Sequence, residues 1–438
     1  MRRWNVELLR SKNNKVIAFL ILTITLIVAR DIFSFKIPMI VFTILTIIVF
    51  LLSNSSDGFL YIIALLPFCR GMPYSEMIVA TLLLDFIKRC SSFDWNIKLK
   101  YYIPIVFITI IELMDYFVFN IPSNEILYLI AYMLFVSYAI DKKMYIGNEY
   151  RYLIAYALTT LASVFIVVIR EINLYGLDYI MTYNVRFGAN TNGLIVTNYN
   201  SNELGLYCCV AVAVLLMLQL ENKQKSLLIL AVVISITGMV SVSRSYILAV
   251  LMIWIIYLIK NQINIKILFY LGFVLLIAVL AINKFFPEVS QWLIHYYETR
   301  SMQASLDGLG GRVAIFSNFT NAVFANIYTV LFGYSEMYGM VLESGAVHNG
   351  TQEIIVSWGI VGFIIAVLWI YNLVKSTTTL VSDKKKIRYF PFVIFLLYIQ
   401  TIQFFTMHNY LLVMMVCIIA ISYVASENSR GDQLWIKN

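Results

Sequence analysis

The chain has 438 residues, of which 61% are hydrophobic and 13% are charged, and its formal net charge is +8. Soluble domains carry roughly 25% charged residues, so this composition excludes an ordinary soluble protein and predicts a polytopic membrane protein. Apolar runs recur from Val16 to Val424, and no polar segment between them is long enough to build a second core. We therefore expect one integral membrane domain over residues 1–438.

Candidate membrane spans follow from the length of each apolar run. Several runs are shorter than the roughly 20 residues that a spanning helix needs, so we predict an all-α bundle of 12–14 transmembrane helices. The short runs 59–69 and 77–87 are either short helices or a re-entrant hairpin. The runs are 16–29, 37–52, 59–69, 77–87, 102–118, 124–140, 152–169, 203–219, 226–242, 246–259, 267–283, 353–374, 389–406 and 409–424.

The distribution of Lys and Arg gives the orientation, because these residues collect on the cytoplasmic side of a membrane protein. With the N-terminus inside, the inner segments hold 23 of the 32 basic residues and the outer segments hold 9. This predicts that both termini are cytoplasmic and that residues 284–352 form a large extracytoplasmic loop. The positive net charge is then a topology signal and needs no nucleic acid as a partner.

Residues 1–150 have short loops and are interpreted as scaffold, whereas the polar clusters begin at Arg170. The first cluster contains Arg186 and Asn202, and its many Asn and Gly residues are typical of turns. Asn202 and Glu203 are a candidate helix start, and the amides of a helix N-terminus attract anions. The cluster is a candidate phosphate site; a solvated loop followed by a helix cap is the alternative.

The next cluster is the short turn 241–245, which contains Arg244 between Ser243 and Ser245. The predicted topology places Arg244 at the outer membrane face. A guanidinium held there can donate parallel hydrogen bonds to a phosphate or a carboxylate. The alternative is an arginine that extends to the lipid headgroups.

The large loop 284–352 contains two segments with apolar residues at helical spacing, and Arg312 opens the second one. We expect both to be interfacial helices that roof a cavity open to lipid, or that pack on the bundle. The apolar positions are Val289, Trp292, Leu293 and Tyr296 in the first segment and Phe316, Phe319, Val323, Ile327 and Leu331 in the second.

His348 and Asn349 lie at the end of this loop, just before the run 353–374. An imidazole can accept a proton near neutral pH, so His348 is a candidate general base. A polar interfacial residue is the alternative. His295 and His408 are also external in the predicted topology, and composition alone does not choose among the three.

Several common site motifs are missing from the sequence. It has no Gly-rich phosphate loop before a helix, no zinc-type spacing of His and Glu, no Asp-x-Asp pair and no Gly-x-Ser-x-Gly. We therefore expect no metal site and no cofactor. Glu112 and Asp115 are exceptions to the scarcity of ionisable residues within the spans, and either could pair with an external Arg or contact a polar substrate.

The ordered motifs of the second half resemble the O-antigen ligase and polymerase superfamily. The resemblance covers roughly residues 180–375 and implies a GT-C-like membrane glycosyltransferase acting on glycans linked to a polyprenyl diphosphate. The motifs are Arg186-Phe187-Gly188, Asn192-Gly193, Asn200 to Gly205, Ser243-Arg244-Ser245, Gly311-Arg312, Leu331 to Tyr334, His348-Asn349-Gly350 and Trp358 to Gly362.

The resemblance also implies roles for residues. His348 would position or deprotonate the acceptor hydroxyl, while the diphosphate and the substrate would be bound by Arg186, Arg244, Arg312, Asn202 and Asn349. The expected reaction is inverting polymerisation of undecaprenyl-diphosphate-linked repeat units of an O-antigen or a capsular polysaccharide at the outer face of the bacterial cytoplasmic membrane. The bilayer and a chain-length regulator protein are the further partners implied.

Two other functions stay open. A ligase would use the same chemistry to transfer the glycan to a lipid-A core or another acceptor. A flippase or transporter for lipid-linked sugars belongs to a different class, and it would depend on a cavity near the membrane midplane and little on His348.

Overall fold

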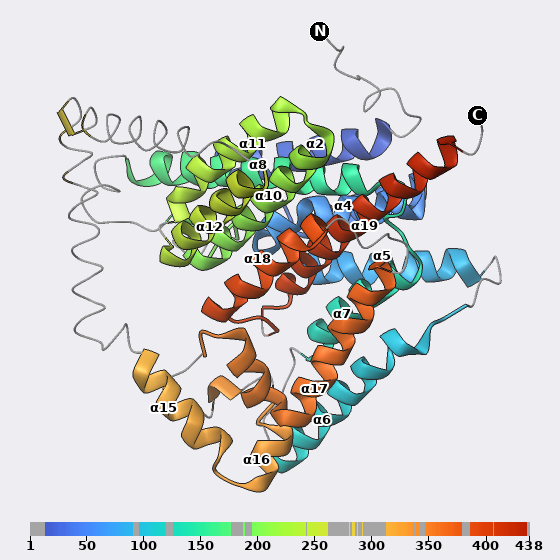
Figure 1. Ribbon diagram of the computed structural model, residues 1–438, viewed down its shortest axis with the longest axis vertical. Coiled ribbons are helices and arrows are strands. Elements are labelled where there is room, and N and C mark those ends of the chain that lie inside the picture. The colour runs from blue at the N-terminus through green and yellow to red at the C-terminus, as the bar shows by residue number, and fades with distance from the viewer. Residues whose placement is uncertain are drawn as a thin grey trace.

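The computed structural model shows a helical bundle, and every regular element in its described part is a helix (Figure 1). The all-α prediction is therefore confirmed for this part of the chain. The described residues are 14–90, 96–119, 126–176, 187–188, 195–241, 243–261, 280, 283–284, 287, 291, 312–335, 338–340, 347–378, 386–405 and 407–435.

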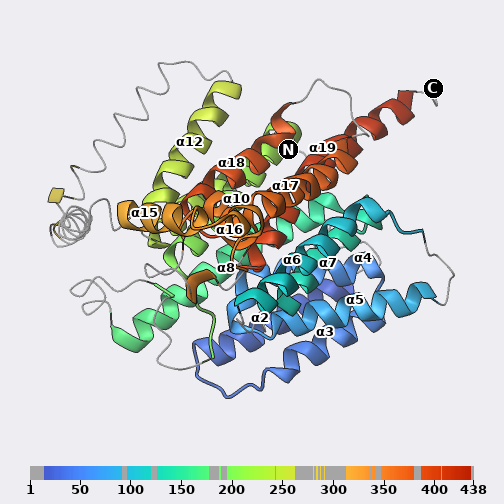
Figure 2. The ribbon, with the colours of Figure 1, turned by 90° about the horizontal axis from the view of Figure 1, so that it is seen from below.

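The described part of the first half of the chain forms eight elements before the long helix α8, of which α2, α4 and η1 pack directly against α8. Helix α4 is buried along most of its length and packs on α8, while α3 packs on α4 and α5 (Figure 2). These helices are α2 (Asn14–Asp31), α3 (Ile40–Leu52), α4 (Ser55–Leu65), η1 (Leu66–Gly71), α5 (Tyr74–Cys90), η2 (Leu99–Tyr101), α6 (Ile103–Phe119), α7 (Ile126–Asp141) and α8 (Glu149–Tyr175).

Helix α10 is the centre of the second half. It packs against α8, α11, α12, α18 and α19, and 94% of its most apolar 18-residue window is buried. The two helices that follow it, α11 and α12, are shorter. The central elements are α10 (Ser201–Asn222), α11 (Lys225–Thr237), η3 (Gly238–Ser241) and α12 (Arg244–Lys260).

Helices from the last part of the chain pack against helices from both the first and the second half of the sequence. Helix α17 packs against α6, and α19 packs against α8, α17 and α18. The elements are α15 (Arg312–Val323), α16 (Ile327–Phe332), η4 (Tyr338–Met340), α17 (Gly350–Thr378), η5 (Lys386–Tyr389), α18 (Phe390–Tyr398), η6 (Ile399–Thr401) and α19 (Asn409–Trp435).

Four helical segments are long and apolar enough to cross a membrane, namely 99–119, α8, α10 and α17. Helix α12 leaves Leu248, Leu251, Ile255 and Ile259 exposed at helical spacing, as expected of a face that contacts lipid. The described part of the chain is thus all-helical and has the features of a membrane protein. The count of 12–14 spans stays a prediction.

The connecting segments between the helices form two groups, one at each end of the bundle, and each group is defined by the contacts among its members. Four of the segments that the charge count assigned to the outer side contact one another near Glu203, and we name this region the Glu203 end. They are the segments around Arg30, Arg70, Thr197 and Ser243. The segments assigned to the inner side meet near Asp57, where Arg151 pairs with Asp57 at 3.3 Å and Asn148 donates to Ser56. We name this the Asp57 end.

Helix α17 is interrupted at Gly359, which has φ 62° and ψ −166°. The chain after α16 fills the interruption: Tyr334 N donates to Val356 O at 2.9 Å, and Ser335 N donates to Ser357 O at 2.8 Å. The carbonyls that lose their helical partners therefore find new donors. The first half of α17 stands as a separate short helix with His348 and Asn349 at its beginning.

The two carboxylates of α6 hold this region in place. Glu112 accepts from Trp358 Nε1 at 2.5 Å, and Asp115 accepts from Tyr328 Oη at 2.8 Å. That either carboxylate also contacts an external Arg or a polar substrate stays a prediction. Of the apolar positions expected on one interfacial face, Phe319 and Val323 are buried, and Phe316 and Ile327 are exposed.

Replacement of Gly359 by Ala is expected to destabilise the protein. The added Cβ would clash with the backbone of Leu331 and Phe332, and this backbone region is open almost only to glycine at a cost of about 1–3 kcal/mol for other residues. Thermal unfolding in detergent should show a lower midpoint for Gly359→Ala. Gly339→Ala is the control, because a Cβ at Gly339 meets no atom of the described residues within 4 Å. Equal midpoints for the two variants would contradict the account.

Candidate functional site

The segment before α10 is fixed by charged side chains. Thr197 is bound on three sides: its backbone N donates to Asp31 Oδ2 at 3.0 Å, its carbonyl accepts from Arg170, and its hydroxyl accepts from Arg30. Arg30 also pairs with Asp31 at 2.6 Å, and Arg170 pairs with Glu171 at 2.8 Å. All four charged residues are buried, so they neutralise one another and hold this loop in a single conformation.

The start of α10 follows from a capping box. Asn200 accepts from the backbone N of Asn202 at 3.1 Å, and Glu203 Oε2 accepts from the backbone N of Asn200 at 3.4 Å. The helix therefore begins at Ser201, with Asn200 as its cap. Asn202 lies in the first turn, where its side chain is free to bind elsewhere.

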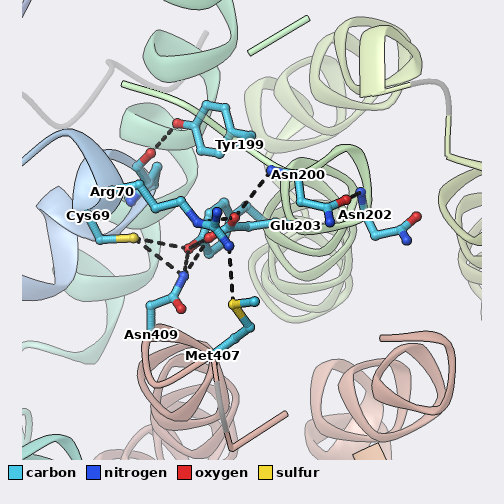
Figure 3. Close-up of polar contacts among 10 residues, drawn as sticks. Cys69, Arg70, Tyr199, Asn200, Asn202, Glu203, Met407 and Asn409 are labelled. Atoms are coloured by element: carbon cyan, nitrogen blue, oxygen red, sulfur yellow. Dashed lines mark hydrogen bonds and ion pairs between the residues drawn. The ribbon is translucent and has the colours of Figure 1, made fainter. Parts of the chain in front are cut away.

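Glu203 is the centre of the polar network at this end (Figure 3). Its buried carboxylate pairs with Arg70 Nε at 2.6 Å, and it accepts from Asn409 Nδ2 at 2.6 Å and Tyr207 Oη at 3.0 Å. The partners come from η1, α10 and α19. A buried carboxylate with three such partners fixes the relative positions of these three elements.

Arg70 is one-third exposed, with 32% of its side chain accessible. Burial acts to lower the pKa of Arg70, but Glu203 and the neighbouring Tyr410, Cys69 and Tyr207 outweigh it, so the pKa is raised. The guanidinium stays protonated.

The N-terminus of α12 joins the same network. Ser243 caps α12 by accepting from Tyr246 N at 3.3 Å, and its hydroxyl donates to Asn202 Oδ1 at 2.7 Å. Tyr398 Oη donates to Asn202 O at 3.0 Å and lies 3.4 Å from Ser243 Oγ. Arg244 follows Ser243 directly and is exposed. The first turns of α10 and α12 therefore lie together, with Arg244 at their surface.

A third helix N-terminus, that of α17, reaches the same end. Asn349 caps it by accepting from Thr351 N and Gln352 N, each at 3.0 Å, and the Asn349 amide donates to Gln400 O at 3.0 Å. Gln400 follows Tyr398 by two residues. His348 is exposed beside this cap.

The connection between α18 and α19, Tyr398–Asn409, runs between these helix starts. The buried Glu353 of α17 accepts from the backbone N of Phe404 and of Phe405. Glu203 holds the far end of the connection through Asn409. Two buried carboxylates thus anchor one segment to α10 and α17.

Four of the six residues expected to bind substrate are described with their side chains, and all four lie at the Glu203 end. Asn202 and Arg244 are brought together through Ser243, whereas His348 and Asn349 are linked to them through Gln400 and Tyr398. Arg186 lies outside the described residues. Arg312 is the first residue of α15, and its side chain also lies outside them.

Arg70, Tyr398 and Asn409 belong to this network but were not predicted from the sequence. Their partners are far away in the sequence, so no local spacing indicates them. Glu203 had a usable signal, because Asn200 and Glu203 have the spacing of a capping box.

No set of three or more His, Cys, Asp or Glu residues within the described ranges is arranged to hold a metal ion. Comparisons with protein-family models, with curated proteins and with solved structures gave no match.

Glu203→Gln is expected to lower the free energy of unfolding. Loss of one partner from a fully buried ion pair costs about 3–5 kcal/mol, and the exposure of Arg70 reduces this to an expected ~1–3 kcal/mol. Thermal unfolding in detergent measures the change. Glu76→Gln is the matched control, because Glu76 is exposed, and its midpoint should stay near that of the original protein. A Glu203→Gln midpoint equal to the control would contradict the anchoring role.

Proposed function

We propose that this chain is an inverting glycosyltransferase that polymerises undecaprenyl-diphosphate-linked oligosaccharide repeat units. It acts at the outer face of the bacterial cytoplasmic membrane, to which we assign the Glu203 end. One observation carries the proposal: three helix N-termini, bearing Asn202, Arg244 and His348, are joined through the single connection Tyr398–Asn409.

The anion-binding part of the proposal rests on charge. The N-terminus of each helix carries a partial positive charge. The N-termini of α10 and α12 lie side by side, and Arg244, the first residue of α12, is exposed at their surface. A diphosphate has several oxygen acceptors that a guanidinium can bind in parallel. Arg244 is therefore assigned to the donor diphosphate, together with Arg186 and Arg312 by resemblance.

The proposed reaction is a single displacement at C1 of the donor sugar. The acceptor hydroxyl oxygen forms a bond to C1 while the bond from C1 to the diphosphate oxygen breaks. The electron pair leaves with undecaprenyl diphosphate, and the hydroxyl proton passes to His348 and then to solvent. The guanidinium stabilises the charge that develops on the leaving group. Because no covalent intermediate forms, the anomeric configuration inverts.

His348 is assigned as the base for its position. It is exposed at the start of the first half of α17, beside the cap residue Asn349. Glu353 fixes this half-helix to the Tyr398–Asn409 connection, and Tyr334 and Ser335 support its other end. A rigid support of this kind keeps a proton acceptor in register with its substrate.

His348→Ala is expected to abolish chain growth, because it removes the proton acceptor. Membranes that contain the protein and its lipid-linked repeat should give a ladder of longer glycans, and the variant should give none at an equal protein level. His408→Ala is the control: His408 is another histidine of this end, packed against the Tyr132 ring at 5.7 Å, and its ladder should persist. A normal ladder from His348→Ala would reject the assignment.

Arg244→Gln is expected to slow the transfer by roughly 100-fold, the order of effect for loss of one donor to a developing charge. Arg244→Lys keeps the charge but loses the paired donors, so an intermediate rate is expected. The rate of repeat-unit consumption measures both. Lys260→Gln removes a cation from the other end of α12 and should leave the rate unchanged. If Arg244→Gln matched Lys260→Gln, Arg244 would have no role in the transfer.

A deletion strain distinguishes polymerisation from the two alternatives. Loss of a polymerase leaves single repeats attached to the final acceptor. Loss of a ligase instead leaves full-length polymer on the carrier lipid, and loss of a flippase leaves lipid-linked repeats at the inner leaflet. Gel analysis of the surface glycan and extraction of the carrier lipid identify which of the three accumulates, and we expect single attached repeats.

A further inference from the structure

A cavity of about 180 Å³ opens at the Asp57 end, away from the proposed transfer site. It lies where η2, the turn after α7 and the end of α17 meet α19. Four lysines from these segments line it, namely Lys98, Lys100, Lys143 and Lys375. One water occupies roughly 30 Å³ of liquid, so the cavity has room for a phosphate group with several waters.

The charge around the cavity is unbalanced. Lys98 lies 3.7 Å from Asp141 Oδ1. In the part of the chain that the structure describes, no carboxylate lies within ion-pair distance of Lys100, Lys143 or Lys375. Three like charges at one opening repel each other, and an anion among them would relieve this repulsion.

Tyrosine rings and hydroxyl groups line the rest of the cavity, and a further ring lies beside a lysine of its rim. The Lys100 ammonium lies 5.0 Å from the centroid of Tyr101, and the Lys375 ammonium lies 5.4 Å from that of Tyr371, so each cation lies near an aromatic ring. The lysines are exposed, whereas Thr377 and Ser422, which also line the cavity, are buried. The cavity therefore has a cationic rim and a floor with hydroxyl groups.

We propose that this cavity binds a phosphate anion, carried by a phospholipid headgroup or free in solution. Topology explains why lysines collect at this end, but it does not explain why these four surround one cavity. Lys223, Lys225 and Lys260 belong to helix ends of the same region, and none of them lines it. Basic pockets between membrane helices suit anionic headgroups for the same electrostatic reason.

Titration of the purified full chain in neutral detergent tests the proposal. The probes are short-chain phosphatidylglycerol and inorganic phosphate, with binding followed by native mass spectrometry and calorimetry. The triple variant Lys100→Gln, Lys143→Gln and Lys375→Gln should bind the preferred probe at least about 10-fold more weakly. The corresponding Lys→Arg triple variant should retain binding and shows that the fold is intact.

The control variant is Lys223→Gln, Lys225→Gln and Lys260→Gln. It removes the same number of charges at the same end of the bundle. It also matches the backbone effect of the cavity variant, because each variant replaces one lysine with a left-handed backbone, Lys223 (φ 55°) in the control and Lys143 (φ 52°) in the cavity variant. Cavity-dependent binding of phosphatidylglycerol alone would identify a lipid site, and cavity-dependent binding of phosphate would identify a site for free phosphate. Equal weakening in both Gln variants, or no binding of either probe, would overturn the proposal.

Discussion

The structure depends on how buried carboxylates are satisfied inside an apolar bundle. An ionised carboxylate in such a place must be paired and hydrogen-bonded. Glu203 meets this requirement with Arg70, Tyr207 and Asn409, which belong to three different elements. The same contacts that neutralise the charge therefore determine where η1, α10 and α19 meet, and Glu353 extends this arrangement to α17.

The two ends of the bundle use charge in different ways. At the Glu203 end, arginines and carboxylates are buried in pairs, and Arg244 and His348 stay exposed beside this rigid frame. At the Asp57 end, lysines surround an open cavity, and among the described residues too few carboxylates lie near them to balance their charge. The first arrangement suits a reaction that needs fixed positions, whereas the second suits reversible binding of an anion.

The sequence predicted the helical class, because long apolar runs and sparse charge admit few other folds. It also located the start of α10 to within a residue or two: the helix begins at Ser201 with Asn200 as its cap, whereas Asn202 and Glu203 had been the candidate start. The interruption of α17 at Gly359 was not predicted, since glycine within an apolar run is a weak signal. Its cause is tertiary, namely the approach of Leu331 and Phe332.

The candidate site was predictable only in part. Asn202, Arg244, His348 and Asn349 were singled out because they belong to polar clusters between the apolar runs and match motifs of the resemblance, and the structure places them at one end. Arg70, Tyr398 and Asn409 were missed because their roles arise from contacts between distant segments. Pairing between residues far apart in the chain leaves no periodic trace in a single sequence.

The most direct test of the proposed function is the stoichiometry of carrier release. The purified chain, reconstituted in bilayer discs with its lipid-linked repeat unit, should release one undecaprenyl diphosphate for each glycosidic bond that forms. The account predicts this one-to-one ratio together with inversion at the newly linked sugar. Intact lipid-linked repeats, with neither release of the carrier nor longer glycan, would contradict it.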